Sequence, residues 1–83
     1  MYYIYSLKCK NGYYISCTNN LRNRLDRHRK GQIPTTSIML PIELEFYFAI
    51  REKHLAFKFE KYLKSGSGRA FANKHLSIKN LES

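Results

Sequence analysis

The chain has 83 residues, of which 15 are Lys or Arg and 6 are Asp or Glu, so its formal net charge at pH 7 is +9. A chain of this length forms one small domain, and its positive charge favours a polyanionic partner, most often a nucleic acid. No stretch approaches the roughly 18 consecutive apolar residues of a membrane-spanning helix, and no signal-peptide pattern is present, so we expect a cytoplasmic protein with no membrane partner.

The N-terminal residues predict a two-stranded antiparallel hairpin, with strands at about 2–9 and 13–18. Runs rich in Tyr, Ile and Cys flank Asn11-Gly12, the dipeptide best suited to positive φ at both central turn positions. With this turn, Tyr5 and Tyr14 share a face of the sheet but lie four strand positions apart, roughly 13 Å at ~3.3 Å per residue. On residue type alone, two such tyrosines are also explained by cross-strand packing.

The two cysteines give no sign of a disulfide or a metal site. Cys9 and Cys17 fall on opposite faces of the predicted hairpin, and their spacing matches no zinc motif. We expect both thiols to be reduced.

A basic helix is predicted next, from about residue 20 to residue 30. Asn20 is a good N-cap and Gly31 a good stop signal. Arg24 and His28 lie on the same side as the apolar residues of the helix, where a guanidinium needs a carboxylate, a phosphate or an aromatic face as partner. The remaining basic residues point elsewhere, and they are ordinary solvated surface until a polyanion binds them.

Residues 32–41 predict a loop, since they contain two prolines and no clear period. A third strand follows at about 42–49, where apolar residues alternate with polar ones and are expected to form one inward side.

A second amphipathic helix is predicted at about 52–64. Glu60 borders its apolar stripe, and the ordinary interpretation of such a residue is an exposed ion pair, here with Lys64. The Gly-Ser stretch after this helix lacks the spacing of a phosphate-binding loop, and we interpret it as a hinge. A short helix at about 69–76 and a C-terminal tail at 77–83 complete the chain.

These elements predict an α+β fold with a three-stranded antiparallel sheet and flanking helices. Within it, the triplets Tyr3-Ile4-Tyr5 and Tyr14-Ile15-Ser16, followed by Arg24 and His28 in a Leu-x-x-Arg-x-x-x-His pattern, resemble the GIY-YIG nuclease family. The resemblance extends over most of the chain, so we expect a single GIY-YIG-like nuclease domain at 1–76. The chain keeps Thr36 in the loop but has Ser37 to Leu40 where relatives carry a basic run.

The resemblance implies a metal-dependent DNA endonuclease, with a role in DNA repair or recombination as one option, and no small-molecule cofactor. Glu60 would hold one Mg²⁺ or Mn²⁺ ion, Arg24 would contact the scissile phosphate, and Tyr5 would act as or orient the general base. The implied catalytic residues are Tyr5, Tyr14, Arg24, His28, Glu60 and Asn73. We expect DNA contacts from Arg22, Arg27, Lys30, Lys64 and Arg69. Asn73 is equally well explained as a surface residue.

A free tyrosine titrates near 10, so Tyr5 can serve as a base only if the metal, Arg24 or His28 lowers its pKa, and the cations around the phenol favour such a lowering. Two features weigh against full activity. Ser16 stands where the family usually has Gly, on the same face as both tyrosines, and the predicted register leaves Tyr5 and Tyr14 roughly 13 Å apart. The alternative function is therefore a catalytically impaired nucleic-acid binding module on the same scaffold, and a protein partner for targeting is left open.

Overall fold

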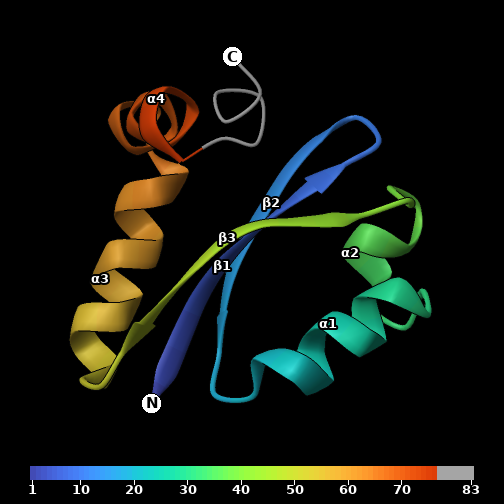
Figure 1. The fold of residues 1–83 in the computed structure, drawn as a ribbon, viewed down its shortest axis with the longest axis horizontal. Coiled ribbons are helices and arrows are strands. Elements are labelled where there is room, and N and C mark those ends of the chain that lie inside the picture. Colours follow the sequence, from blue (N-terminus) through green and yellow to red (C-terminus); the bar gives the residue numbers. More distant parts are fainter. Residues whose placement is uncertain (77–83) are drawn as a thin grey trace.

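A computed structural model describes residues 1–76 of the chain. They form an α+β fold in which a three-stranded antiparallel sheet is covered by α1 and α2 on one face and by α3 on the other (Figure 1). The predicted fold class is confirmed. In chain order the elements are β1 (Tyr2–Cys9), β2 (Gly12–Thr18), α1 (Leu21–Arg29), α2 (Pro34–Ser37), β3 (Glu43–Ile50), α3 (Lys53–Lys64) and α4 (Gly66–His75). The predicted C-terminal tail at 77–83 lies outside the described residues.

The strand order is β2-β1-β3, and the β1 and β2 register differs from the predicted one. Cys9 pairs with Gly12, so Lys10 and Asn11 form the turn, and Gly12 has a positive φ of 152°. The Lys10 N–H is hydrogen-bonded to the Met39 carbonyl oxygen at 2.9 Å and is not available to extend the hairpin. The predicted pairing of β1 with β2 is therefore wrong by two residues. Because side chains alternate with period two, a shift by an even number of residues leaves every side chain on its predicted face.

Two hydrophobic cores lie on the two faces of the sheet. Ile4 and Ile15 pack against Ala56 and Leu63 of α3, and Ile4, Ala56 and Leu63 have no exposed surface. The other core joins Tyr5, Leu7 and Cys9 to Leu25 of α1. The central strand β1 contributes to both cores because successive side chains alternate between the faces.

A β-bulge divides β3 into two segments that face opposite helices. The alternation in Ile42 to Phe48 predicts one continuous apolar side, and that prediction is wrong. The register shifts between Ser6 and Leu7, so Leu44 pairs with Leu7 in the core of α1, whereas Phe46 pairs with Ser6 and packs in the core of α3. The extra residue of a bulge changes the side to which the following residues point.

Glu45 is that extra residue, and its carboxylate is buried. Its Oε1 accepts hydrogen bonds from Ser6 Oγ at 2.9 Å and from Arg69 Nη2 at 3.1 Å, and the Glu45 side chain has 0% exposed surface. The Arg69 guanidinium also lies over the Tyr13 ring, 4.1 Å from its centroid. Arg69 thus ties α4 to the hairpin and to β3.

The Gly-Ser stretch is part of α4, so its interpretation as a hinge is wrong. Ser65 caps the helix by accepting from the Gly68 N–H, and Gly68 is buried against α3. A Cβ at Gly68 would overlap the backbone of Tyr62. Glycine is therefore required for the close approach of the two helices.

No helix within residues 1–76 has the length and apolar character needed to cross a membrane.

The pairing of Arg69 with Glu45 predicts a large stability effect. Arg69→Met should lower the free energy of unfolding by about 3 kcal/mol, because it leaves the Glu45 carboxylate buried without its charged partner. Urea unfolding measures the change, and Lys61→Met, at an exposed position of α3, should change it by no more than about 0.5 kcal/mol. Equal effects of the two substitutions would contradict the structural role of Arg69.

Candidate active site

Three aromatic rings meet on the α1 face of the sheet. The Tyr5 and Tyr14 centroids are 6.4 Å apart, and the His28 ring is 5.7 Å from Tyr5 and 5.2 Å from Tyr14. In the observed register Tyr5 pairs with Ser16, so the two tyrosines are diagonal neighbours two positions apart. The two tyrosines are therefore two strand positions apart, and not four as the predicted hairpin had them.

A buried hydrogen-bond chain joins Tyr5 to α1 and α2. The Tyr5 hydroxyl lies 2.8 Å from His28 Nε2, and His28 Nδ1 lies 2.6 Å from Thr36 Oγ1. The Thr36 hydroxyl also donates to the Ile33 carbonyl oxygen at 3.5 Å. We therefore assign the imidazole proton to Nδ1, which donates to Thr36, and the lone pair to Nε2, which accepts from Tyr5.

Burial keeps both ends of the Tyr5 and His28 pair neutral near pH 7. Burial raises the pKa of Tyr5 and the Tyr14 phenol raises it further, while Arg24 and the hydrogen bond from Ser16 act in the opposite direction. The pKa of His28 is lowered by burial and then by the charges of Arg24 and Arg27. The lowered pKa that Tyr5 would need to act as a free base is thus not found.

Arg24 is the half-buried cation of this cluster. It comes from the side of α1 that also carries His28, and its charge acts on the pKa of Tyr5 and on that of His28. Its position next to a neutral phenol and a neutral imidazole leaves the guanidinium able to bind an anion.

Glu60 approaches the same part of β2 from the other face of the sheet. Burial raises the pKa of the Cys17 thiol and the Glu60 carboxylate raises it further, while Arg24 lowers it. Cys17 follows Ser16 directly in β2, which is an edge strand. Arg24 and Glu60, from helices that cover opposite faces of the sheet, therefore both act electrostatically on this segment of β2.

The Glu60 carboxylate is available for a cation only in part. Its Oε2 pairs with Lys64 Nζ at 2.7 Å, as expected for the ordinary ion pair, and the Glu60 side chain is 19% exposed. Within residues 1–76 no group of three or more His, Cys, Asp or Glu side chains could hold a metal ion. One carboxylate still fits a hard divalent ion that keeps several waters and takes a substrate phosphate as a further ligand.

The expected DNA-contacting residues differ in their surroundings. Arg22, Arg27 and Lys30 are exposed on α1, where Lys30 pairs with Asp26 at 2.9 Å. Lys64 is exposed next to Glu60. Arg69, in contrast, is held by Glu45 and Tyr13, so its contact with DNA stays a prediction.

Asn73 lies on the exposed surface of α4, where its Oδ1 accepts from Arg69 Nε at 3.2 Å. This contact connects it to the Arg69 and Glu45 pair. Its part in a catalytic site stays a prediction.

The sequence interpretation does not include Thr36 among the site residues. Thr36 has no exposed surface and fixes the His28 tautomer from α2, a segment predicted as loop. The available signal was the resemblance itself, because family members often carry a Thr in this loop.

Comparison with known protein families gives a match over most of the chain. A family model described as the GIY-YIG catalytic domain matches residues 1–75. No curated protein and no solved structure matches the chain at a significant level.

The lowered pKa of His28 predicts a pH dependence. NMR titration of its imidazole should give a midpoint below the ordinary value of 6.5, because the folded chain favours the neutral ring. The matching contribution to stability is fully present above about pH 6.5 and is lost as the pH falls through the folded-state pKa, by at most ~1.4 kcal/mol per pH unit. His28→Gln should show a shallower loss on acidification. A midpoint at or above 6.5 would contradict the buried neutral assignment.

Proposed function

This chain belongs to the GIY-YIG family of nucleases, and we propose that it is a divalent-metal-dependent DNA endonuclease. The observation that supports this most is the arrangement around Ser16 and Cys17 of β2. The Tyr5, Tyr14 and His28 cluster lies with Arg24 on one face, and Glu60 lies on the other. Hydrolysis of a phosphodiester needs an anion-binding group, a proton acceptor and a ligand for the metal, and this set contains all three.

Arg24 holds the scissile phosphate in this proposal. Its guanidinium is half-buried, and a charge-assisted hydrogen bond is stronger where water is partly excluded. The same contact stabilises the charge that develops on the phosphoryl oxygens in the transition state.

The proton of the attacking water passes to the phenols, which are backed by His28. Tyr14 is half-buried and can meet the water, whereas Tyr5 has no exposed surface and donates to His28 Nε2. Because burial raises the pKa of Tyr5, a free tyrosinate is disfavoured, and Tyr5 acts as a relay: Tyr14 takes the proton of the water and gives its own to Tyr5, which gives its own to His28 Nε2. Thr36 then accepts a hydrogen bond from the imidazolium.

Glu60 would hold the metal, and nucleases of this family are generally dependent on a divalent ion. When bound, Mg²⁺ or Mn²⁺ supplies Lewis-acid stabilisation of the phosphate and leaving oxygens. Lys64 must release Glu60 for this to occur, and DNA phosphates are suitable new partners for its ammonium group.

The second candidate function is a binding module without cleavage, and Ser16 favours it. Ser16 is the strand partner of Tyr5 and lies on the same face, so its CH₂OH group lies on the side from which a phosphate or a water would approach the phenols. The net charge of +9 suits DNA binding under either function. A cytoplasmic location, a repair or recombination role and a targeting partner are further parts of the proposal.

Glu60→Gln separates cleavage from binding. With nicked, branched and linear DNA in Mg²⁺ or Mn²⁺, the substitution should reduce the cleavage rate by orders of magnitude, because it removes the carboxylate that holds the ion. Affinity for DNA in EDTA should hold or increase, since one negative charge near the phosphates is lost. Arg24→Ala should weaken both cleavage and binding.

Two matched controls accompany this prediction. Glu43→Gln and Arg51→Ala change the same residue types at exposed positions outside the site and should leave the cleavage rate unchanged. Wild-type rates in Glu60→Gln would contradict the metal assignment. No cleavage of any DNA by the wild-type chain, with DNA binding retained, would favour the binding module.

Ser16→Gly should raise the cleavage rate, because it frees the approach to Tyr5. The same substitution should lower the free energy of unfolding by about 0.5–1 kcal/mol, since glycine is unfavourable in a strand. Ser16→Ala removes the hydroxyl but keeps the Cβ and should give an intermediate rate. A cleavage rate in Ser16→Gly at or below that of the wild type would show that Ser16 does not limit access.

A further inference from the structure

A groove separate from the candidate site lies on the α1 face of the sheet, toward β3. It has a volume of about 560 Å³, and its lining includes Tyr3, Tyr47, Arg22, Arg29, Asn20 and Leu25. Neither Tyr5 nor His28 lines this groove. It therefore offers a binding surface that the proposed hydrolysis does not use.

Two tyrosine rings from the sheet line the groove. Tyr3 of β1 and Tyr47 of β3 are 6.2 Å apart in an edge-to-face arrangement, and Tyr47 is 53% exposed. Tyr47 pairs with Tyr5, so its ring lies on the face that carries the candidate site. An exposed ring of this kind presents a flat surface on which a base can stack.

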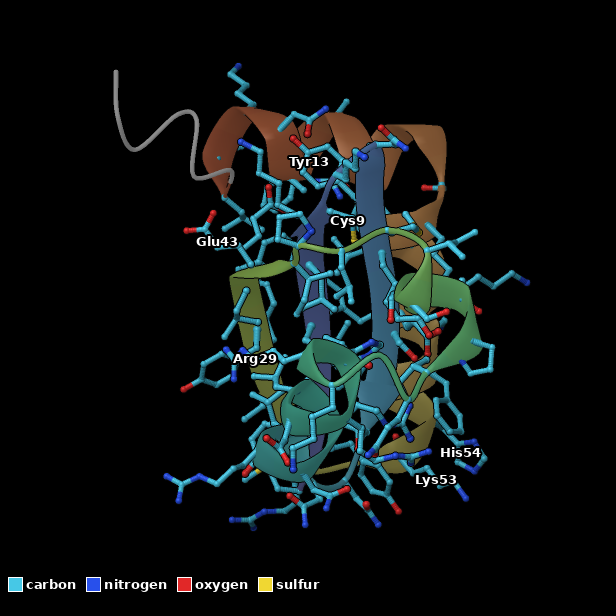
Figure 2. The ribbon with its side chains drawn as sticks, turned by 90° about the vertical axis from the view of Figure 1, so that its right-hand side faces the viewer. Cys9, Tyr13, Arg29, Glu43, Lys53 and His54 are labelled. Atoms are coloured by element: carbon cyan, nitrogen blue, oxygen red, sulfur yellow. The ribbon has the colours of Figure 1, made fainter. Side chains whose placement is uncertain are left out.

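Two arginines on α1 border these rings. Arg22, Leu25 and Arg29 follow one another at spacings of three and four residues, which places them on one stripe of the helix. The two arginines are about 10 Å apart along the axis at ~1.5 Å per residue. Figure 2 shows Arg29 beside β3. Within the described part of the chain neither guanidinium forms an ion pair. The acidic residue of α1, Asp26, pairs with Lys30 instead.

We infer that this groove binds an unpaired nucleotide of a DNA strand. The base stacks on Tyr47, and Arg22 and Arg29 contact the flanking phosphates. Aromatic stacking together with backbone cations is the usual way in which proteins hold single strands without sequence preference. An acidic peptide would use the cations but gain little from the exposed ring.

The inference rests on the proposed function for its biological setting. One flank of α1 presents Arg24 and His28 to the cluster beside β2, and the other presents Arg22 and Arg29 to the groove. A DNA with a junction between duplex and single strand can therefore place a phosphate at the candidate site and an unpaired base in the groove. The preferred substrate is accordingly a flap or a branched DNA.

The test uses a single-stranded oligonucleotide with one 2-aminopurine base, in EDTA, so that cleavage is not required. Wild-type chain should quench the 2-aminopurine fluorescence by stacking. Tyr47→Leu should weaken binding about tenfold and abolish the quenching, whereas Tyr47→Phe keeps the ring and should behave as wild type. Tyr62→Leu is the matched control, because Tyr62 is also exposed (42%) but lies on α3.

The arginines are tested by salt dependence. Arg22→Gln and Arg29→Gln should each weaken binding of the oligonucleotide and reduce its salt slope by about 0.7, the value for one single-strand phosphate contact. Lys61→Gln on α3 should leave the slope unchanged. Affinity for a blunt duplex should be unaffected by Tyr47→Leu.

Several results would overturn the inference. They are wild-type binding and quenching in Tyr47→Leu, equal losses in Tyr62→Leu, or displacement of the oligonucleotide by a poly-glutamate peptide at equal charge concentration. Binding through Tyr47 in a chain that cuts no DNA would overturn the nuclease proposal and support the groove. If the wild-type chain cuts DNA and Tyr47→Leu binds a flap as tightly as the wild type, the nuclease proposal is supported and the groove inference is overturned.

Discussion

The buried hydrogen-bond chain from Tyr5 through His28 to Thr36 is the constraint on which the arrangement of the α1 face depends. It joins the central strand to two helices, and its three side chains have no exposed surface. Buried polar groups are costly unless each has a partner, so the chain fixes the ring of His28 and the place of α2 together. Tyr14 and Arg24 lie next to this hydrogen-bond chain and are partly exposed, so water can reach them. Tyr5, His28 and Thr36 are buried beneath them.

The edge position of β2 explains how groups from opposite faces of a sheet can serve one site. If β2 were a central strand, the strands on both sides of it would separate Arg24 on one face from Glu60 on the other. In the proposed site at this edge, a phosphate alongside Ser16 and Cys17 would meet the guanidinium from α1 and the carboxylate from α3. The opposite effects of Arg24 and Glu60 on the Cys17 thiol are the electrostatic sign of this arrangement.

Most of the elements and the pairing of faces were predictable, because the period-two and helical patterns are local. The hairpin register was not, since the turn depends on a hydrogen bond from Lys10 to Met39, far along the sequence. The bulge at Glu45 was missed for a similar reason: the alternation of β3 is unbroken in sequence, and only the partners Ser6 and Arg69 show that this carboxylate is buried. Gly68 was misread because a flexible linker and a close helix contact use the same residue type.

Paramagnetic broadening by Mn²⁺ tests whether groups from the two faces of the sheet form one site on the β2 edge. The ¹⁵N-labelled chain is titrated with Mn²⁺ in the presence of a phosphorothioate DNA, and the amide signals are followed. We expect the Cys17, Glu60 and Arg24 signals to broaden together at the lowest Mn²⁺ concentrations. Broadening confined to exposed carboxylates such as Asp26 or Glu43, with the Cys17 and Glu60 signals unchanged, would contradict this expectation.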